Sequence, residues 1–296
     1  MPTTWRHLPS SEAEWVLCST HLFAHHARFA GAARDARKFV YTHTPARYVW
    51  TPELDLRGNG AIARAVSPAL QVLDRKRAQE SHSIAANSNF VAERIARTWD
   101  RESITIYPPV SVSAFANAVT EELSAEDAAI LTQLPETFLL GASRFVPYKR
   151  LDIAIEAGIA ADVPVVIAGD GPDEARLRAL AELHPAKVTF INRPSSLLLR
   201  HLYARALALV FPAIEDFGIM PVEAMASGTP VIANRVGGVS ESVIDGKTGV
   251  LLDSFDPSSL REAVSRAALT SSADCVARAW QFDESVFDQE ILRWVR

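Results

Sequence analysis

Short runs of Val, Ile and Leu alternate with longer amphipathic segments, and this alternation constrains the fold more than any other feature of the chain. Strands that alternate with helices form a parallel sheet covered by helices. After about residue 137, six runs have the length and composition of buried strands: 138–142, 164–168, 187–191, 207–211, 230–234 and 249–252. The pattern therefore predicts an α/β fold, and six such strands make one complete doubly wound unit.

The first part of the chain carries fewer strand candidates, at 15–19, 38–42, 83–86 and 103–107. Pro108 and Pro109 then interrupt regular structure and favour an extended linker. We predict three parts, namely a partial α/β domain over 1–110, a complete one over 111–281 and a terminal helix over 282–296. In a doubly wound sheet that lacks its earliest strands, strand 15–19 would lie at an open edge.

Composition limits the class of protein. The 296 residues are 48% hydrophobic and 22% charged, which is typical of a soluble globular chain with two cores. No apolar run reaches the roughly 18 residues of a transmembrane helix, and the first residues lack a signal peptide's apolar segment. We expect a cytoplasmic protein, with docking at the inner face of the membrane left open. The net charge of −5 argues against nucleic acid as a partner.

The strongest local motif is E-D-F-G-I-M-P-V-E, which runs from Glu215 to Glu223. Pro221 suits the first turn of a helix, because its missing N–H loses no hydrogen bond there. The backbone N–H groups just before that helix would bind an anion or a hydroxyl; these belong to Phe217, Gly218, Ile219 and Met220. Carboxylates accept hydrogen bonds from vicinal diols. The motif predicts a nucleotide-sugar site, and the alternative is an ordinary helix start with acidic residues.

A second motif, G-A-S-R-F-V-P-Y-K-R at 141–150, follows an apolar run and precedes a helical pattern. Arg144 and Lys149 would lie in the loop near the start of that helix. A guanidinium and an ammonium at this place can neutralise a diphosphate. The alternative is a solvated basic loop, which the residues alone do not exclude.

The segment G-D-G-P-D-E at 169–174 follows a strand and opens a helix, but it fails the G-x-G-x-x-G test for dinucleotide binding. Gly169 and Gly171 remain candidate binding positions. Asn192 follows the next strand, in F-I-N-R-P-S, and we expect it to adopt the left-handed conformation that Asn tolerates.

Histidines gather in the first part of the chain. His43 would end a strand at the carboxyl edge of the sheet, where α/β proteins place ligand sites, and a structural role in the loop is the alternative. His21, His25 and His26 have spacings that could share a helix face. We find no H-E-x-x-H motif, no third ligand at a recognisable spacing and no cysteine pair, so we predict no metal site.

The two donor-side motifs, with A-M-A-S-G-T-P-V-I-A and G-G after the first, resemble the signature of family four of the retaining glycosyltransferases. That family has the GT-B fold, with two Rossmann-like domains facing a cleft. The segments V-Y-T-H-T-P-A-R-Y-V-W, A-N-S-N-F-V-A-E-R-I and I-Y-P-P-V resemble a subgroup of GDP-mannose-dependent mannosyltransferases of cell-surface polysaccharide assembly. The resemblance implies a hexosyltransferase that uses a nucleotide sugar, with GDP-mannose favoured, and a glycan or lipid-linked acceptor. It also implies a terminal helix that crosses back to the first domain.

The resemblance implies a role for each candidate residue. Arg144 and Lys149 would hold the donor diphosphate, and Glu215 with the 217–220 backbone would hold the hexose. Glu223 would hold the ribose, and His43 would line the cleft beside the transferred sugar. A nucleotide-side loop would include Gly169, Gly171 and Asn192. The chain has no D-x-D motif, so we expect neither a metal ion nor any cofactor besides the donor.

Two other functions stay open on the sequence. One is a sugar-nucleotide epimerase with the same fold, and the other is a non-catalytic nucleotide-sugar-binding or assembly subunit. The short first domain motivates the second alternative. It also leads us to expect a partner chain or a second copy of this chain at the open edge of strand 15–19, with poor transfer by the chain alone.

Overall fold

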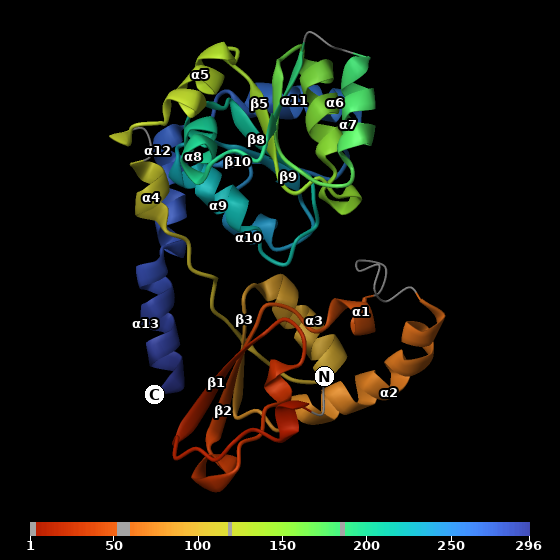
Figure 1. Cartoon of the computed structure of the whole chain (residues 1–296). Coiled ribbons are helices and arrows are strands. Elements are labelled where there is room, and N and C mark those ends of the chain that lie inside the picture. Colours follow the sequence, from red (N-terminus) through yellow and green to blue (C-terminus); the bar gives the residue numbers. More distant parts are fainter. Residues whose placement is uncertain (1–3, 52–59, 118–119, 184–186) are drawn as a thin grey trace. The chain divides into compact units, whose positions relative to one another are not determined.

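The computed structural model describes residues 4–51, 60–117, 120–183 and 187–296 (Figure 1). The chain divides into two compact units, and each contains a parallel sheet. Unit 1 comprises Met1–Tyr107 and Gln289–Arg296, and unit 2 comprises Pro108–Asp288. The division lies close to the predicted linker, and helix α13 (Glu284–Val295) contributes residues to both units.

Unit 2 contains a six-stranded parallel sheet in the order β10-β9-β8-β5-β6-β7. Counted from β5, this is the doubly wound order 3-2-1-4-5-6, so the prediction of a complete doubly wound unit is confirmed. All six predicted strands are present within one residue of their expected bounds. The strands are β5 (Leu139–Ala142), β6 (Val165–Gly169), β7 (Val188–Asn192), β8 (Ala208–Phe211), β9 (Val231–Asn234) and β10 (Gly249–Leu252).

Helices cover both faces of this sheet. In Figure 1, α6, α7 and α11 lie together on one side, and α4, α5, α8, α9 and α12 lie on the other, in agreement with their contacts. All residues of β5, β8 and β10 are buried, as expected for parallel strands between two helical layers. The helices are α4 (Val112–Ala116), α5 (Ala125–Gln133), η7 (Pro147–Lys149), α6 (Leu151–Ala161), α7 (Glu174–Glu182), α8 (Ser196–Arg205), α9 (Ile219–Ala226), α10 (Val239–Ser242), α11 (Pro257–Ala267), α12 (Ser272–Ala279) and η8 (Trp280–Phe282).

Unit 1 contains a four-stranded parallel sheet in the order β1-β2-β3-β4. The four predicted strands are present, although β4 is shorter than expected. They are β1 (Trp15–Thr20), β2 (Arg37–Thr42), β3 (Ser83–Ala86) and β4 (Ile104–Thr105). The helical elements are η1 (Thr4–Arg6), η2 (Ala24–His26), η3 (Gly31–Arg34), α1 (Arg47–Trp50), α2 (Ala61–Ala78) and α3 (Asn89–Trp99).

Strand β1 lies at the edge of its sheet, as predicted. Within the described residues it pairs with β2 alone. Trp15 is 42% exposed and Leu17 is 39% exposed, so apolar side chains accompany the open edge. On the same unit, Trp294 of α13 donates a hydrogen bond from Nε1 to Ser83 Oγ at 2.8 Å, and its ring lies 5.2 Å from that of Phe39. None of the helices in the described ranges is both long and apolar enough to cross a membrane.

Candidate functional site

The loops after β5 and β8 leave the carboxyl edge of the unit 2 sheet where its strand order reverses, because these two strands are neighbours. Open α/β sheets bind ligands at such a point. Lys149 ends the 3₁₀ helix after β5, and Glu215 lies in the loop after β8. The Lys149 ammonium donates to Glu215 Oε1 at 2.5 Å, and the two side chains are 14% and 16% exposed. Two motifs predicted separately thus meet in a sheltered ion pair.

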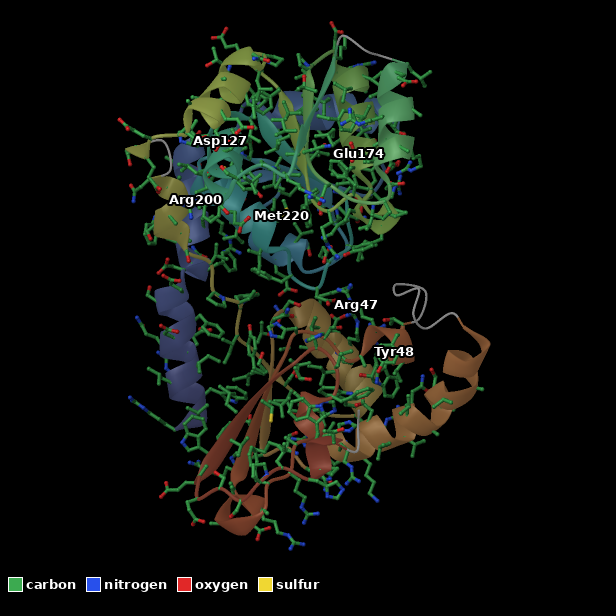
Figure 2. All side chains as sticks on the ribbon, viewed as in Figure 1. Arg47, Tyr48, Asp127, Glu174, Arg200 and Met220 are labelled. Carbon is green, nitrogen blue, oxygen red and sulfur yellow. The ribbon has the colours of Figure 1, made fainter. Side chains whose placement is uncertain are left out.

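The start of α9 adjoins this ion pair along the chain. Gly218 precedes the helix with φ of +94°, a conformation that favours glycine. Pro221 lies in the first turn, as predicted, and no side chain of the described residues caps that turn. The Phe217 side chain is buried against Phe282, with ring centroids 5.5 Å apart. Met220, labelled in Figure 2, lies in the first turn of the helix. The helix therefore presents uncapped backbone N–H groups next to Glu215.

The glycine pair after β9 holds the Glu215 loop in place. Gly238 N donates to the carbonyl oxygen of Glu215 at 2.9 Å. A Cβ atom on Gly238 would lie 2.2 Å from the carbonyl oxygen of Asp216, so the two backbones approach too closely for any side chain. The sequence analysis included this pair in the family signature. Its physical role is to let the loop after β9 pack closely on the loop that carries Glu215.

Glu223 lies one turn further along α9 and contacts α8. Tyr203 Oη donates to Glu223 Oε2 at 3.2 Å. Burial raises the pKa of Glu223, and the bond from Tyr203 and the charge of Arg200 only partly oppose this. Sequence reasoning missed Tyr203, because a tyrosine beside core leucines on a helix has the pattern of an ordinary packing residue.

Arg144 lies in the same loop as Lys149 but is exposed. Among the residues that the structure describes, its hydrogen bond runs from Nη2 to Tyr148 Oη at 3.4 Å. Arg144 thus lies near the sheet edge without joining the ion pair of Lys149 and Glu215.

The G-x-G turn packs on the loop after β5. Gly169 and Gly171 have φ of +141° and +146°, and Cβ atoms there would lie 1.9 Å from Ser143 O and 2.5 Å from Phe145 O. Close backbone approach accounts for both glycines. The turn leads into α7, whose first residue, Glu174, is labelled in Figure 2.

Asn192 does not adopt the left-handed conformation that was expected for it. Asn192 is the last residue of β7, and Arg193 instead adopts the left-handed conformation, with φ of +48°. The Asn192 side chain donates from Nδ2 to Glu174 Oε1 at 3.1 Å. Its amide is therefore engaged with the start of α7, and Arg193 makes the turn.

His43 belongs to unit 1 and directly follows β2, at the carboxyl edge where it was expected. Its Nε2 lies 2.9 Å from Ser19 Oγ, and its ring lies 5.2 Å from that of Tyr41. Ser19 ends up beside it because β1 and β2 pair in register. The role of His43 in ligand binding stays a prediction.

Two of the histidines lie beside an aspartate, a third residue of a type that can bind a metal ion. His25, His26 and Asp74 are buried, and their ligand atoms all lie within 4.8 Å of one another, so the group could hold a metal ion. Asp74 Oδ1 lies 3.0 Å from His25 Nε2 and 2.8 Å from His26 Nε2. Its Oδ2 accepts hydrogen bonds from the indoles of Trp50 and Trp99, each at 2.7 Å. Three N–H donors and the nearby His25 imidazole around one carboxylate account for the cluster as a polar network in the core.

Comparison with known proteins identifies the family. Residues 122–274 match the model of glycosyl transferases group 1, and the chain belongs to this family. It is 31% identical over 214 residues to a D-inositol 3-phosphate glycosyltransferase of Mycobacterium sp. (strain KMS). This match covers 67% of this chain and 48% of the relative. A protein of the same name from Salinispora tropica is 30% identical over 241 residues, and this match covers 71% of this chain and 50% of that relative. The chain thus spans about half the length of these curated relatives.

Solved structures support the fold. Anabaena HepE in complex with UDP and glucose has a TM-score of 0.68 at 21% identity, over 89% of this chain and 72% of that one. Sucrose-phosphate synthase from Thermosynechococcus elongatus has a TM-score of 0.67 at 23% identity, over 88% and 67% of the two chains. Together with the family match, these similarities identify the α/β architecture as the GT-B type.

Proposed function

We propose that unit 2 binds a nucleotide-sugar donor and that the protein transfers its hexose to an acceptor with retention of configuration. The observation that carries the proposal is the ion pair of Lys149 and Glu215, which lies where the strand order reverses and next to the uncapped start of α9. This arrangement offers a cation to a diphosphate and, beside it, a carboxylate and N–H donors to sugar hydroxyls.

The mechanism that this arrangement supports relies on the leaving group. As the bond from the sugar C1 to the diphosphate oxygen breaks, negative charge grows on the diphosphate, and Lys149 and Arg144 stabilise it. The acceptor oxygen bonds to C1 on the same side and gives its proton to the departing phosphate. Glu215 and the backbone of 217–220 hold the hexose, while Glu223 holds the ribose.

The finer parts of the proposal concern the two substrates. The N-terminal motifs favour GDP-mannose as the donor. A glycan or lipid-linked acceptor follows from the same resemblance. The names of two relatives add D-inositol 3-phosphate, a polyol phosphate, as a second class of acceptor to test.

Thermal-shift measurements with GDP-, UDP- and ADP-sugars test donor binding, since a ligand that binds only the native state raises stability with the logarithm of its excess over Kd. We expect the GDP-sugar to give the largest shift, and the absence of a shift with every sugar nucleotide would contradict the proposal. Donor isomerisation without an acceptor would favour an epimerase. Binding without transfer or isomerisation would favour a non-catalytic subunit.

Glu223→Gln should weaken nucleoside diphosphate binding by about 1.5–3 kcal/mol, because one charged hydrogen bond to the ribose is lost. Glu215→Gln should leave that affinity nearly unchanged and lower turnover. Isothermal titration with GDP and UDP gives the affinities. Glu182→Gln, at an exposed position of α7, is the matched control. Equal affinities for wild type and Glu223→Gln would show that the ribose assignment is wrong.

Transfer activity should persist in excess EDTA, because Lys149 and Arg144 supply the positive charge that a divalent ion would otherwise place on the diphosphate. The measurement is the initial rate of acceptor-dependent transfer with and without chelator. Complete loss of activity that manganese restores would contradict the metal-independent mechanism.

A further inference from the structure

Unit 1 contains a cavity of about 270 Å³ that the donor chemistry does not use. It lies beside β1 and β2 and is also lined by residues of η3. Val16, Ala27 and Phe29 give it apolar walls. Its charged lining consists of Arg28, Arg34, Lys38 and Glu80.

The cavity has more cations than its carboxylate can neutralise. Glu80 is the one carboxylate among the described lining residues, and it is already bonded to two arginines outside the lining. Arg6 Nη1 donates to it at 2.5 Å and Arg77 Nη1 at 2.6 Å. Across the described part of the chain, the guanidinium groups of Arg28 and Arg34 have no hydrogen-bond or ion-pair partner. Positive charge therefore remains uncompensated at the cavity.

Lys38 brings a buried charge to the same cavity. Its side chain is 9% exposed, and Nζ donates to the carbonyl oxygens of His25 at 2.8 Å and Ala27 at 3.3 Å. The Glu80 carboxylate lies further away, at 3.6 Å. Burying an ammonium is costly unless an anion compensates it. An anion in the cavity would supply this compensation.

We propose that this cavity binds a phosphate group, with the guanidinium forks of Arg28 and Arg34 as donors and Lys38 as a buried point charge. Planar forks match phosphate oxygens, and a dianion offsets more charge than a carboxylate does. The volume is at the lower end for small-molecule sites and fits a small phosphate ester or a lipid headgroup. Trp5 is partly exposed and its carbonyl oxygen accepts from Arg28 N at 2.8 Å, which places an interfacial type of side chain beside the site.

The test uses the full chain and two probes. Inorganic phosphate is titrated calorimetrically, and vesicles of phosphatidylcholine with or without phosphatidylglycerol are used in flotation assays. Arg28→Ala combined with Arg34→Ala should weaken binding by about tenfold or more, since each charged hydrogen bond contributes about that factor. Arg97→Ala, an exposed arginine of α3 in the same unit, should bind as wild type does.

Two further variants keep the outcome decisive. Arg28→Lys with Arg34→Lys preserves the charge, so it should fold and retain an intermediate affinity. Lys149→Ala should leave this site unchanged, because it alters only unit 2. Preference for phosphatidylglycerol vesicles identifies a lipid headgroup as the source of the phosphate, and binding of free phosphate alone identifies a soluble ester. The proposal is wrong if wild type binds neither probe, or if Lys149→Ala abolishes phosphate binding and the double alanine variant does not.

Discussion

Lys149→Ala should lower kcat by about 10²–10³-fold, the effect of removing one preorganised donor from a developing anion. Lys149 Nζ contacts Glu215 at 2.5 Å, so the ammonium is held at the sheet edge. Its interaction with the diphosphate strengthens as the glycosidic bond breaks, and binding of a free nucleoside should therefore change much less than the rate. Steady-state transfer kinetics and nucleoside titration separate the two effects.

Lys247→Ala is the matched control for this experiment. Lys247 belongs to the same unit, its side chain is 60% exposed, and its ammonium lies 3.5 Å from Asp274 Oδ1 at the surface. Its replacement should leave kcat near the wild-type value. A Lys149→Ala enzyme with wild-type kcat would show that the ion pair with Glu215 is structural and that the leaving group is stabilised elsewhere.

Most of the fold could be predicted because parallel strands between two helical layers are near-continuous apolar runs. Runs such as 139–142 and 208–211 are fully buried, and their order follows from the doubly wound rule. The edge position of β1 followed in the same way, from a count of strands.

The contacts within the candidate site were less predictable, because a sequence pattern gives the face of an element but not the residue opposite it. Lys149 and Glu215 lie 66 positions apart and were assigned to different parts of the donor. Asn192 and Arg193 show a second limit. Either residue could have made the turn; Arg193 makes it, while the Asn192 side chain donates a hydrogen bond to Glu174.

The same limit explains why Asp74 was not expected beside His25 and His26. The aspartate lies 48 positions after His26, on a helix whose pattern alone gives no reason to look for a buried charge. Trp50 and Trp99 complete the network through their indole N–H groups. A buried carboxylate that accepts hydrogen bonds from His26, Trp50 and Trp99 connects α1, α2, α3 and η2.

Asp74→Asn should therefore destabilise unit 1 by about 3–5 kcal/mol, the usual cost of removing one partner from a buried charged network. The amide keeps the shape of the carboxylate but loses its charge and presents an N–H₂ group to N–H donors. Five of the six tryptophans belong to unit 1, so urea unfolding followed by tryptophan fluorescence reports mainly on this unit. Asp35→Asn, at an exposed position of the same unit, should change the free energy of unfolding little. An Asp74→Asn protein as stable as wild type would show that the network contributes specificity of packing rather than stability.

The pH dependence of the same measurement separates the two kinds of group in the network. Burial opposes ionisation of Asp74, but the hydrogen bonds from His25, His26 and Trp50 outweigh it and hold the pKa of Asp74 below its usual range. Its contribution is thus present above the unfolded pKa of about 3.9 and is lost as pH falls further. Burial lowers the pKa of His25, so the unfolded state binds more protons below about pH 6.5 and acid destabilises the fold from there. Wild type should lose stability in both windows. Asp74→Asn should keep the histidine window and lose less stability than wild type in the lower one, where Glu80 still contributes because hydrogen bonds from Arg6 and Arg77 outweigh its burial and lower its pKa to about 2.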